Sequence, residues 1–515
     1  MSGKLSRSEQ LGKLEALGGQ CDILIIGGGA TGLAAAMDAA LRGHKVVLVE
    51  ANDFAAGTSS RSTKLVHGGV RYLKQGRISL VRESLRERGR LLRNAPGIVH
   101  KRGFVVPCRS PLDKPYYGMG LAAYDLLAGS YGWGNTRLLS KSETLSELPG
   151  LEEKGLLGGV FYWDGQFDDS RLALAMARTA ANAGAVILNH SKAVALTHEN
   201  GRVVGAKIEA KRIGIAGETE TCAIEIRARV VISAAGVFSD ELARMDEPDA
   251  AERVTASQGA HIVLDRSFFP GECALMVPKT DDGRVLFLIP WEGGVLVGTT
   301  DTPVSKIEAE PKPLEEEIDY LLDYTGRYLV RKPRRSDIRS RFAGLRPLVK
   351  PSGKVASTAA VSRDHQIFVS DTGLISILGG KWTTCRQMGQ DVVDKAETVG
   401  ALPRKPCRTD EFALDEGADA PGYDRTTESN SKVLIESPLL TEEMVRRMAQ
   451  SEMAETVEDV LARRIRALFL DARAAREAAG EVARILAEEK GWSAPEQERQ
   501  KADFDRLALG YLEAG

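Results

Sequence analysis

Long apolar runs are missing from this 515-residue chain. No uninterrupted apolar stretch approaches the ~18–20 residues that cross a bilayer, and residues 1–20, a predicted N-terminal extension, contain no apolar signal core. We therefore expect neither a membrane span nor secretion by this route. Contact with a membrane surface stays open.

An excess of one charge and clustered cysteines are missing as well. The chain has 69 Lys and Arg residues against 71 Asp and Glu residues, a formal net charge of -2. Without a global basic field, nucleic acid is not an expected partner. The six cysteines form no CxxC pair and no ligand-like cluster, which is typical of a reduced cytoplasmic protein. We expect no disulfide frame and no metal site.

The length predicts two or three domains. Residues 21–50 have the pattern strand, glycine turn, helix, strand, and the middle of the chain is β-rich with a hairpin signal at 290–294. An almost wholly helical pattern begins at 438 after a polar linker, and a capping box at 456–459 predicts a helix through Leu461 and Leu468. We expect an α/β fold: a Rossmann-like cofactor-binding domain, an inserted antiparallel β-rich substrate domain and an all-helical C-terminal domain. The predicted ranges are 21–110, 155–245 and 355–405 for the first, 111–154 and 246–354 for the second, and 408–515 for the third.

The first glycine-rich turn predicts a dinucleotide site. Residues 27–32 read GGGATG, a GxGxxG motif with an apolar strand before it and an Ala-rich helix after it. The glycines permit a tight turn, a close approach of pyrophosphate and close packing of helix on strand, while the helix N-terminus favours the phosphates. Glu50 ends the second strand about 20 residues further on, where an acid binds ribose hydroxyls. This unit alone does not separate FAD from NAD.

Two further segments favour FAD. Residues 230–236 form a strand that ends in small residues, and residues 378–384 give another junction of strand, glycines and helix. A helix that begins at the second junction aims its positive end at the flavin pyrimidine edge. Three dispersed segments that converge on one extended cofactor suit FAD better than NAD.

A longer motif carries a family resemblance. Residues 58–73, TSSRSTKLVHGGVRYL, resemble the signature of FAD-dependent glycerol-3-phosphate dehydrogenases, and the match runs from about residue 20 to 400. Two positions depart from it: Ser233 stands where the family usually has Asn, and Cys385 where it often has Tyr. Three more segments match the family: 289–301, 343–348 and 379–384.

The resemblance implies oxidation of sn-glycerol 3-phosphate to dihydroxyacetone phosphate, with FAD as cofactor. A site for a doubly charged phosphate needs cations, and guanidinium binds phosphate bidentately. The predicted substrate-binding residues are Arg71, Tyr72, Arg346, Arg363 and Lys381. The predicted cofactor-binding residues are Gly27, Gly28, Gly29, Ala30, Thr31, Gly32, Glu50, Thr58, Ser59, Ser60, Thr63, Lys64, Leu65, His67, Gly68, Gly69, Val194, Ala235, Gly236, Gly344, Arg346, Gly380, Lys381, Trp382 and Thr383.

Two histidines are candidates for the base that takes the C2 hydroxyl proton. His67 lies in the glycine-rich family motif, and His261 lies at the start of a predicted strand. A histidine pKa near neutrality suits this task, and we favour His261 while His67 stays open. Arg346 and Lys381 complete the predicted catalytic set.

The electron acceptor is inferred by resemblance only. It implies quinone, and hence peripheral contact with the inner face of the cell membrane, and it allows a homodimer. Residues 116–133 are an apolar, aromatic candidate for that contact, but core packing is the other interpretation. Other functions stay open: a glycerol-3-phosphate oxidase that uses oxygen, an amine or amino-acid oxidase, and a non-catalytic flavoprotein scaffold.

Overall fold

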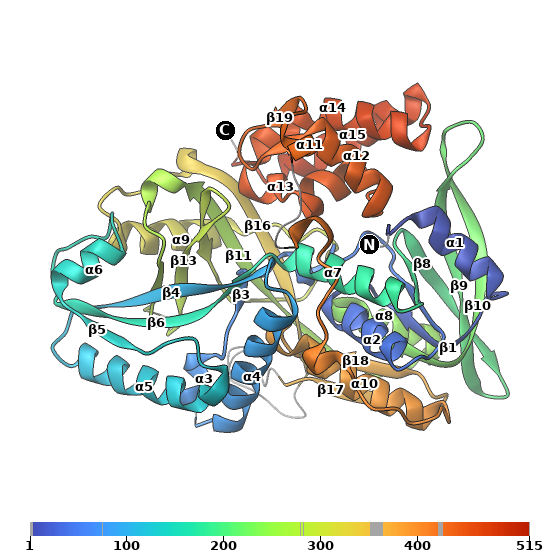
Figure 1. Cartoon of the computed structure of the whole chain (residues 1–515), viewed down its shortest axis with the longest axis horizontal. Helices are drawn as coiled ribbons and strands as arrows, with labels where there is room; N and C mark the ends of the chain where they lie inside the picture. The colour runs from blue at the N-terminus through green and yellow to red at the C-terminus, as the bar shows by residue number, and fades with distance from the viewer. Residues whose placement is uncertain are drawn as a thin grey trace.

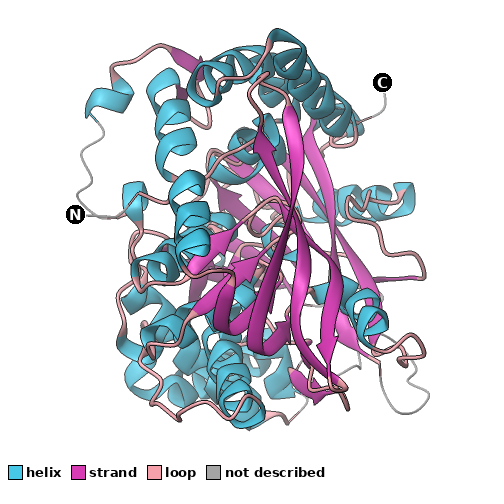
Figure 2. Ribbon diagram, turned by 90° about the vertical axis from the view of Figure 1, so that its right-hand side faces the viewer, coloured by secondary structure: helices cyan, strands magenta, loops and turns pink. Residues whose placement is uncertain are grey.

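The computed structural model describes residues 4–74, 76–278, 280–281, 283–350, 364–420 and 426–513. Two large sheets lie side by side, with a helical C-terminal region above them in the view of Figure 1. Figure 2 shows long strands across one side of the molecule and helices over the rest. The predicted α/β fold class, with an antiparallel second sheet and a helical C-terminal region, is confirmed.

The first sheet has eight strands, and its centre is parallel. Ile23, Leu24 and Ile25 of its central strand are all fully buried, as expected when helices cover both faces of a parallel sheet. The path through this sheet is β17 (Gln366–Val369), β18 (Ile375–Leu378), β10 (Thr219–Ser233), β1 (Gln20–Ile26), β2 (Val46–Val49) and β7 (Val186–Leu188), with β8 (Ser191–Glu199) and β9 (Arg202–Ile213) joined to β10 as an antiparallel extension.

Small residues let helices pack closely on one another beside this sheet. A Cβ on Gly389 would lie 2.7 Å from the backbone of Ala34, so one helix crosses another at almost backbone contact. The Ala-rich composition after the first glycine turn therefore serves packing as well as helix propensity. The helices of this part are α1 (Arg7–Ala16), α2 (Ala30–Leu41), α7 (Asp169–Asn182), α8 (Ser239–Asp246) and α10 (Cys385–Val399).

The second sheet has ten strands and is mostly antiparallel. The predicted hairpin is present, with Glu292 and Gly293 at positive φ in its turn. The path is β15 (Thr302–Val304), β11 (Val254–Asp265), β14 (Gly294–Gly298), β13 (Leu286–Trp291), β12 (Ala274–Val277), β4 (Val99–Cys108), β6 (Gly158–Phe167) and β3 (Leu65–Val66), with β16 (Ile338–Val349) on β11 and β5 (Arg137–Leu139) on β6. Its helices are α3 (Val70–Lys74), α4 (Ile78–Asn94), α5 (Asp113–Ala128), α6 (Lys141–Glu147) and α9 (Glu315–Tyr328).

Strands β3, β4 and β6 belong to this second sheet, although they fall within the ranges 21–110 and 155–245 predicted for the cofactor-binding domain. Long-range strand pairing places them there, and their local sequence does not report their partners. The division of the chain into domains by residue range stays a prediction.

The C-terminal region packs on both sheets rather than standing apart, and Thr219 of β10 donates to Glu496 at 2.7 Å. Phe469 contacts Phe342 of β16 edge to face at 4.8 Å between ring centroids, and Tyr511 at 5.3 Å. The elements of this region are α11 (Thr426–Ser429), β19 (Val433–Ile435), β20 (Leu440–Thr441), α12 (Glu442–Ser451), a π-helical turn (Asp459–Arg464), α13 (Ala467–Leu470), α14 (Ala472–Lys490) and α15 (Ala494–Leu509).

One predicted helix of this region is wrong in its length. The capping box is present, since Thr456 Oγ1 accepts a hydrogen bond from Asp459 N and the Asp459 carboxylate accepts one from Thr456 N. The helix does not continue to Leu468, because Arg466 adopts a left-handed φ of 63° and separates the π-helical turn from α13. The break allows the Arg466 side chain to enter the first part of the chain.

Candidate functional site

The first glycine turn joins β1 to α2, as the motif predicts. Gly27 has a φ of 116°, and a Cβ on Gly32 would overlap the carbonyl oxygen of Gly27. At the N-terminus of α2, Ala30 N donates to Ser59 Oγ at 3.0 Å. A turn that excludes side chains, with backbone N–H groups and a hydroxyl at a helix N-terminus, is suited to hold a pyrophosphate.

Glu50 lies at the end of β2 beside this turn. Its carboxylate accepts hydrogen bonds from Gly28 N at 2.6 Å and from Asn52 N at 2.8 Å. Burial raises the pKa of Glu50 even though both backbone donors favour the charged form. The acid therefore lies at the strand end where the motif places a ribose-binding group.

Two of the other predicted segments meet the loop after Gly57, and a third lies beside β1. Thr58 Oγ1 donates to Leu345 O at 2.6 Å, and Trp382 Nε1 donates to Ser59 O at 2.8 Å. His67 N donates to Thr383 Oγ1 at 3.1 Å. Residues 230–233 pair with β1, the strand that leads into the glycine turn, so these segments lie near one another. Val194 is the bulged residue of β8, and its role stays a prediction.

His261 projects from β11 into a buried position against this loop. Its Nε2 lies 3.0 Å from Thr63 Oγ1, and its ring stacks on Phe342 at 4.9 Å between centroids. Among the described residues its Nδ1 has no hydrogen-bond partner. Burial, with the charges of Lys64 and Arg346 nearby, lowers the pKa of His261 well below its usual value, so the ring is neutral.

Arg346 lies on β16, next to the same strand. Its guanidinium donates to Thr300 O at 3.0 Å, to Thr299 Oγ1 and Gln258 O at 3.2 Å, and contacts Asp301 at 3.4 Å. The guanidinium lies against Gly259, and a Cβ on that residue would come within 2.4 Å of it and displace it. The glycine thus makes room for a fixed cation two residues from His261 along β11.

Lys381 and Tyr72 lie together, as expected for the predicted substrate-binding set. The Lys381 Nζ lies 4.1 Å from the Tyr72 ring centroid, a cation–π contact. Arg71 is in α3, but its side chain lies outside the described residues, and so does the whole of Arg363. The roles predicted for the individual site residues stay proposals.

Lys64 lies buried behind the loop that carries Ser59, and its predicted role toward the cofactor stays a prediction. Its side chain is fully buried, with Nζ donating to Asp169 at 2.6 Å and to Ser60 O at 2.8 Å. Burial and the neighbouring charge of Arg466 lower the pKa of Lys64 to about 7. No sequence pattern marks Asp169 or Arg466 as partners of Lys64, because they lie 105 and 402 residues from it and carry no motif.

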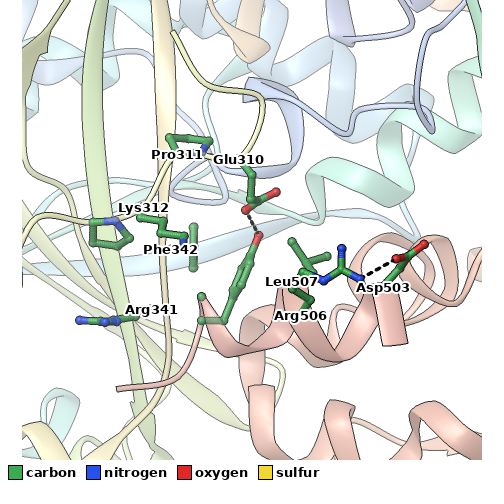
Figure 3. A pocket seen from close by; sticks show the side chains of 11 residues that line it. Glu310, Pro311, Lys312, Arg341, Phe342, Asp503, Arg506 and Leu507 are labelled. Carbon is green, nitrogen blue, oxygen red and sulfur yellow. Dashed lines mark hydrogen bonds and ion pairs between the residues drawn. The ribbon is translucent and has the colours of Figure 1, made fainter. Parts of the chain in front are cut away.

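A cavity of about 180 Å³ lies behind Phe342. Glu310, Phe342 and Tyr511 are among its lining residues (Figure 3). Glu310 also forms an ion pair at 2.6 Å with the buried Arg61 of the loop after Gly57. Phe342 separates this cavity from His261, so it opens at the C-terminal region and not at the glycine turn.

Comparisons with known proteins agree with this geometry. A model of FAD-dependent oxidoreductases matches residues 22–386, and a model described as the C-terminal domain of alpha-glycerophosphate oxidase matches residues 409–497. A mitochondrial glycerol-3-phosphate dehydrogenase of Arabidopsis thaliana is 39% identical over 93% of this chain and 85% of its own, and one of Rattus norvegicus is 37% identical over 95% and 73%. The chain belongs to the FAD-dependent glycerol-3-phosphate dehydrogenase family.

A solved structure extends the likeness to the whole family fold. The glycerol-3-phosphate dehydrogenase of Bacillus halodurans, solved in complex with FAD, has a TM-score of 0.76 and 29% identity, over 98% of both chains. The predicted family, the predicted enzyme class and the Rossmann-like FAD-binding fold are thereby confirmed, and so is FAD as cofactor. The residues at the glycine turn fit FAD, because backbone N–H groups and the Ser59 hydroxyl meet at the N-terminus of α2 and glycines stand where side chains would collide with the chain.

Proposed function

We propose that the chain oxidises sn-glycerol 3-phosphate to dihydroxyacetone phosphate. The observation that carries the proposal is the neutral, buried side chain of His261. It contacts Thr63 of the loop after Gly57 and lies near the fixed cation of Arg346. Relatives that cover more than nine-tenths of the chain are named for this activity. Bound FAD supplies the acceptor for the hydride that leaves C2.

The substrate phosphate would be held by cations. Arg346 offers a positive charge whose position is fixed by Thr299, Thr300 and Gln258, so little side-chain entropy is lost on binding. Lys381 offers a second charge, fixed against Tyr72. Arg71 and Arg363 complete the proposed set by resemblance.

His261 would accept the proton of the C2 hydroxyl. A general base must be unprotonated before the reaction, and burial keeps this imidazole neutral. One ring nitrogen contacts Thr63, and the other is left without a partner among the described residues. His67 is the alternative base, since its backbone is fixed by Thr383 in the same region.

Anaerobic titration tests the proposal. The purified protein loaded with FAD is mixed with glycerol 3-phosphate without oxygen, and the flavin absorbance is followed. We expect bleaching at one equivalent of substrate per flavin, with dihydroxyacetone phosphate formed. A flavin that stays oxidised would contradict the proposed activity and favour the scaffold function. Bleaching by amines or amino acids instead would favour that oxidase class.

For the electron acceptor we propose a quinone, at the cytoplasmic face of a membrane. Among the described residues, no helix is both long enough and apolar enough to span a bilayer. Helix α5 instead supports surface contact, because Leu112, Tyr116, Met119 and Leu126 are exposed at helical spacing on and just before it.

Oxygen is the second candidate acceptor. The C-terminal match to a domain named for alpha-glycerophosphate oxidase favours it, whereas the dehydrogenase relatives favour quinone. Peroxide yield and reduction of a soluble quinone analogue, measured in one aerated reaction, separate the two. We expect electrons to appear chiefly in the quinone; peroxide equal to the substrate consumed would assign the oxidase activity.

A further inference from the structure

Arginine side chains of the C-terminal region extend to the loops after β2, in the part of the chain that binds the cofactor. They come from residues 463–466, which we name the arginine segment, and which span the break between the π-helical turn and α13. Arg463, Arg464 and Arg466 are all buried. Burying three guanidinium groups is costly unless each is paired, so their partners define what the segment does.

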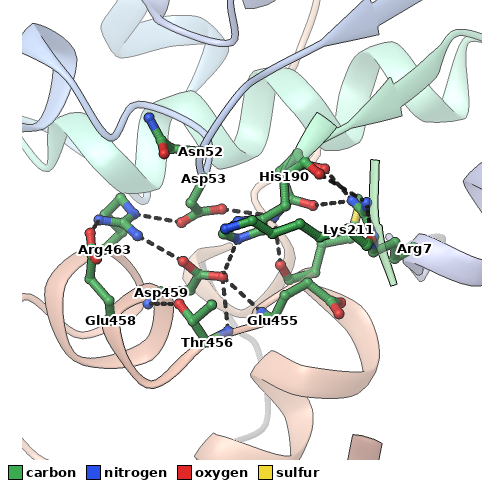
Figure 4. Close-up of polar contacts among 12 residues, drawn as sticks. Arg7, Asn52, Asp53, His190, Lys211, Glu455, Thr456, Glu458, Asp459 and Arg463 are labelled. Atoms are coloured by element: carbon green, nitrogen blue, oxygen red, sulfur yellow. Dashed lines mark hydrogen bonds and ion pairs between the residues drawn. The ribbon is translucent and has the colours of Figure 1, made fainter. Parts of the chain in front are cut away.

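The first anchor is Asp53, which follows the ribose-binding position. Arg464 donates to both carboxylate oxygens of Asp53, at 2.6 and 2.9 Å, and Arg463 donates to one of them at 2.6 Å. Figure 4 shows Asp53 and Asp459 facing Arg463 and His190. Two residues after Asp53, Ala55 N donates to Gly28 O at 3.0 Å, so this contact bears directly on the glycine turn.

The second anchor is the loop that carries Ser59. Arg466, with 2% of its surface exposed, donates to Ser60 O at 2.6 Å and to Ser170 Oγ at 2.7 Å. Ser60 O also accepts from Lys64 at 2.8 Å. The adjacent Ser59 meets both the N-terminus of α2 and Trp382.

We propose that the arginine segment positions the two loops that bind FAD, with Arg464 holding residues 53–55 and Arg466 holding residues 58–64. The helical C-terminal region then acts on cofactor affinity, and Arg464 and Arg466 are positioning residues that do not touch the cofactor. The inference rests on the FAD-binding fold and holds whatever the substrate is.

Electrostatics support the role of Arg466. The Lys64 ammonium faces Asp168 and Asp169 at the N-terminus of α7, Arg466 from the arginine segment and His261 from β11. Burial and the charge of Arg466 disfavour the charged form of Lys64. Arg466 and Lys64 thus share one buried acceptor, Ser60 O.

Measured affinity for FAD tests the proposal. FAD is removed from the full-length protein, and the rebinding of FAD is followed by quenching of flavin fluorescence in Arg466→Met, Arg464→Met and the unchanged chain. We expect the dissociation constant to rise about tenfold or more in each variant, while far-ultraviolet circular dichroism of the apoprotein is kept. Arg466→Lys retains the charge and one contact and is expected to recover part of the affinity.

The matched control is Arg476→Met. Arg476 lies on α14 of the same region, and its ion pair with Asp505 is partly exposed. We expect no change in FAD affinity there. Should Arg466→Met fail to fold, Ser170→Ala removes one acceptor of Arg466 and is expected to weaken FAD binding about fivefold, the effect of one lost hydrogen bond. Wild-type FAD affinity in folded Arg466→Met or in Ser170→Ala, with only a lower unfolding temperature, would overturn the proposal.

Discussion

His261 is held by contacts that suit a base rather than a cation. Its ring is stacked on Phe342, and Gly298 leaves no room for a side chain above Cδ2. Burial, and then the charges of Lys64 and Arg346 that a protonated imidazole would face, explain why its pKa lies well below 6.5. The side chain is thus neutral across the range in which the enzyme is expected to work.

We predict that His261→Ala lowers the rate constant for anaerobic flavin reduction by about 100-fold or more, the usual contribution of a general base. In the unchanged protein, protonation of His261 should not slow reduction until the pH falls well below 6.5, because a lowered pKa keeps the ring neutral above it. Stopped-flow absorbance under substrate saturation measures both.

The exposed His100 provides the control for this prediction, and His100→Ala should leave the rate unchanged. A near-normal rate in His261→Ala together with a large loss in His67→Ala would move the base to His67.

At the scale of elements, the β1–turn–α2 unit depends on glycines that no other residue replaces. We predict that Gly32→Ala abolishes FAD retention during purification, since the new methyl group would overlap the carbonyl oxygen of Gly27. The ratio of the flavin absorbance at about 450 nm to the protein absorbance at about 280 nm measures how much of the protein holds FAD.

Gly12→Ala is the matched control for the glycine turn. Gly12 lies inside α1 with open space around its Cα, so a methyl group is accommodated and favours the helix by up to ~1 kcal/mol. Full FAD content in Gly32→Ala would show that the turn tolerates a side chain and would contradict the fit to the pyrophosphate.

Helix α5 has two apolar faces with different roles. Leu121 and Tyr124 are buried against the second sheet, whereas Met119 and Leu126 are 71% and 83% exposed. Core packing and surface contact, the two interpretations of residues 116–133, thus apply to opposite faces of one helix. Only the exposed face is open to a membrane, so Leu121 is unsuited to a docking test.

We predict that Met119→Asp with Leu126→Asp reduces flotation with liposomes that contain anionic lipid, because a carboxylate in the interface loses apolar contact and repels the headgroups. Val330→Asp, at a 64% exposed apolar position away from α5, should float as the unchanged chain does. Equal flotation of all three would contradict docking through α5.

At the scale of the whole molecule, a buried ion pair joins the first part to the C-terminal region. His190 Nε2 lies 2.9 Å from Asp459 Oδ2. Burial alone would lower the pKa of His190, but Asp459 prevails and raises it. A raised folded-state pKa contributes stability below the unfolded value of about 6.5, and this stability is lost as the pH rises through the folded-state pKa.

We predict that His190→Gln lowers the free energy of unfolding by about 1–3 kcal/mol near pH 6 and by less above the folded-state pKa. Denaturant titrations at the two pH values measure the difference. His198→Gln alters a more exposed His–Asp pair, with Asp246, and should cost under about 1 kcal/mol. A larger loss at high pH than at low pH in His190→Gln would contradict the charged pair.

Local sequence determined much of the fold and part of the site. Gly27, Gly32 and Glu50 could be placed from sequence because a tight turn, a helix start and a strand end depend on nearest neighbours. The hairpin at Glu292–Gly293 followed for the same reason. The long motif over 58–73 then indicated the family before any contact was known.

Only the tertiary structure decided which distant groups meet. Arg466 reaches Ser60 across 406 residues, and the break in the chain that permits this lies where the sequence pattern predicts a continuous helix. Likewise, Leu121 and Met119 are both apolar in the sequence. Only the packing of α5 shows that Leu121 is buried and Met119 is exposed. Side-chain type and spacing fix local conformation, whereas the pairing of buried charges and the choice of a buried face depend on which surfaces the whole chain brings together.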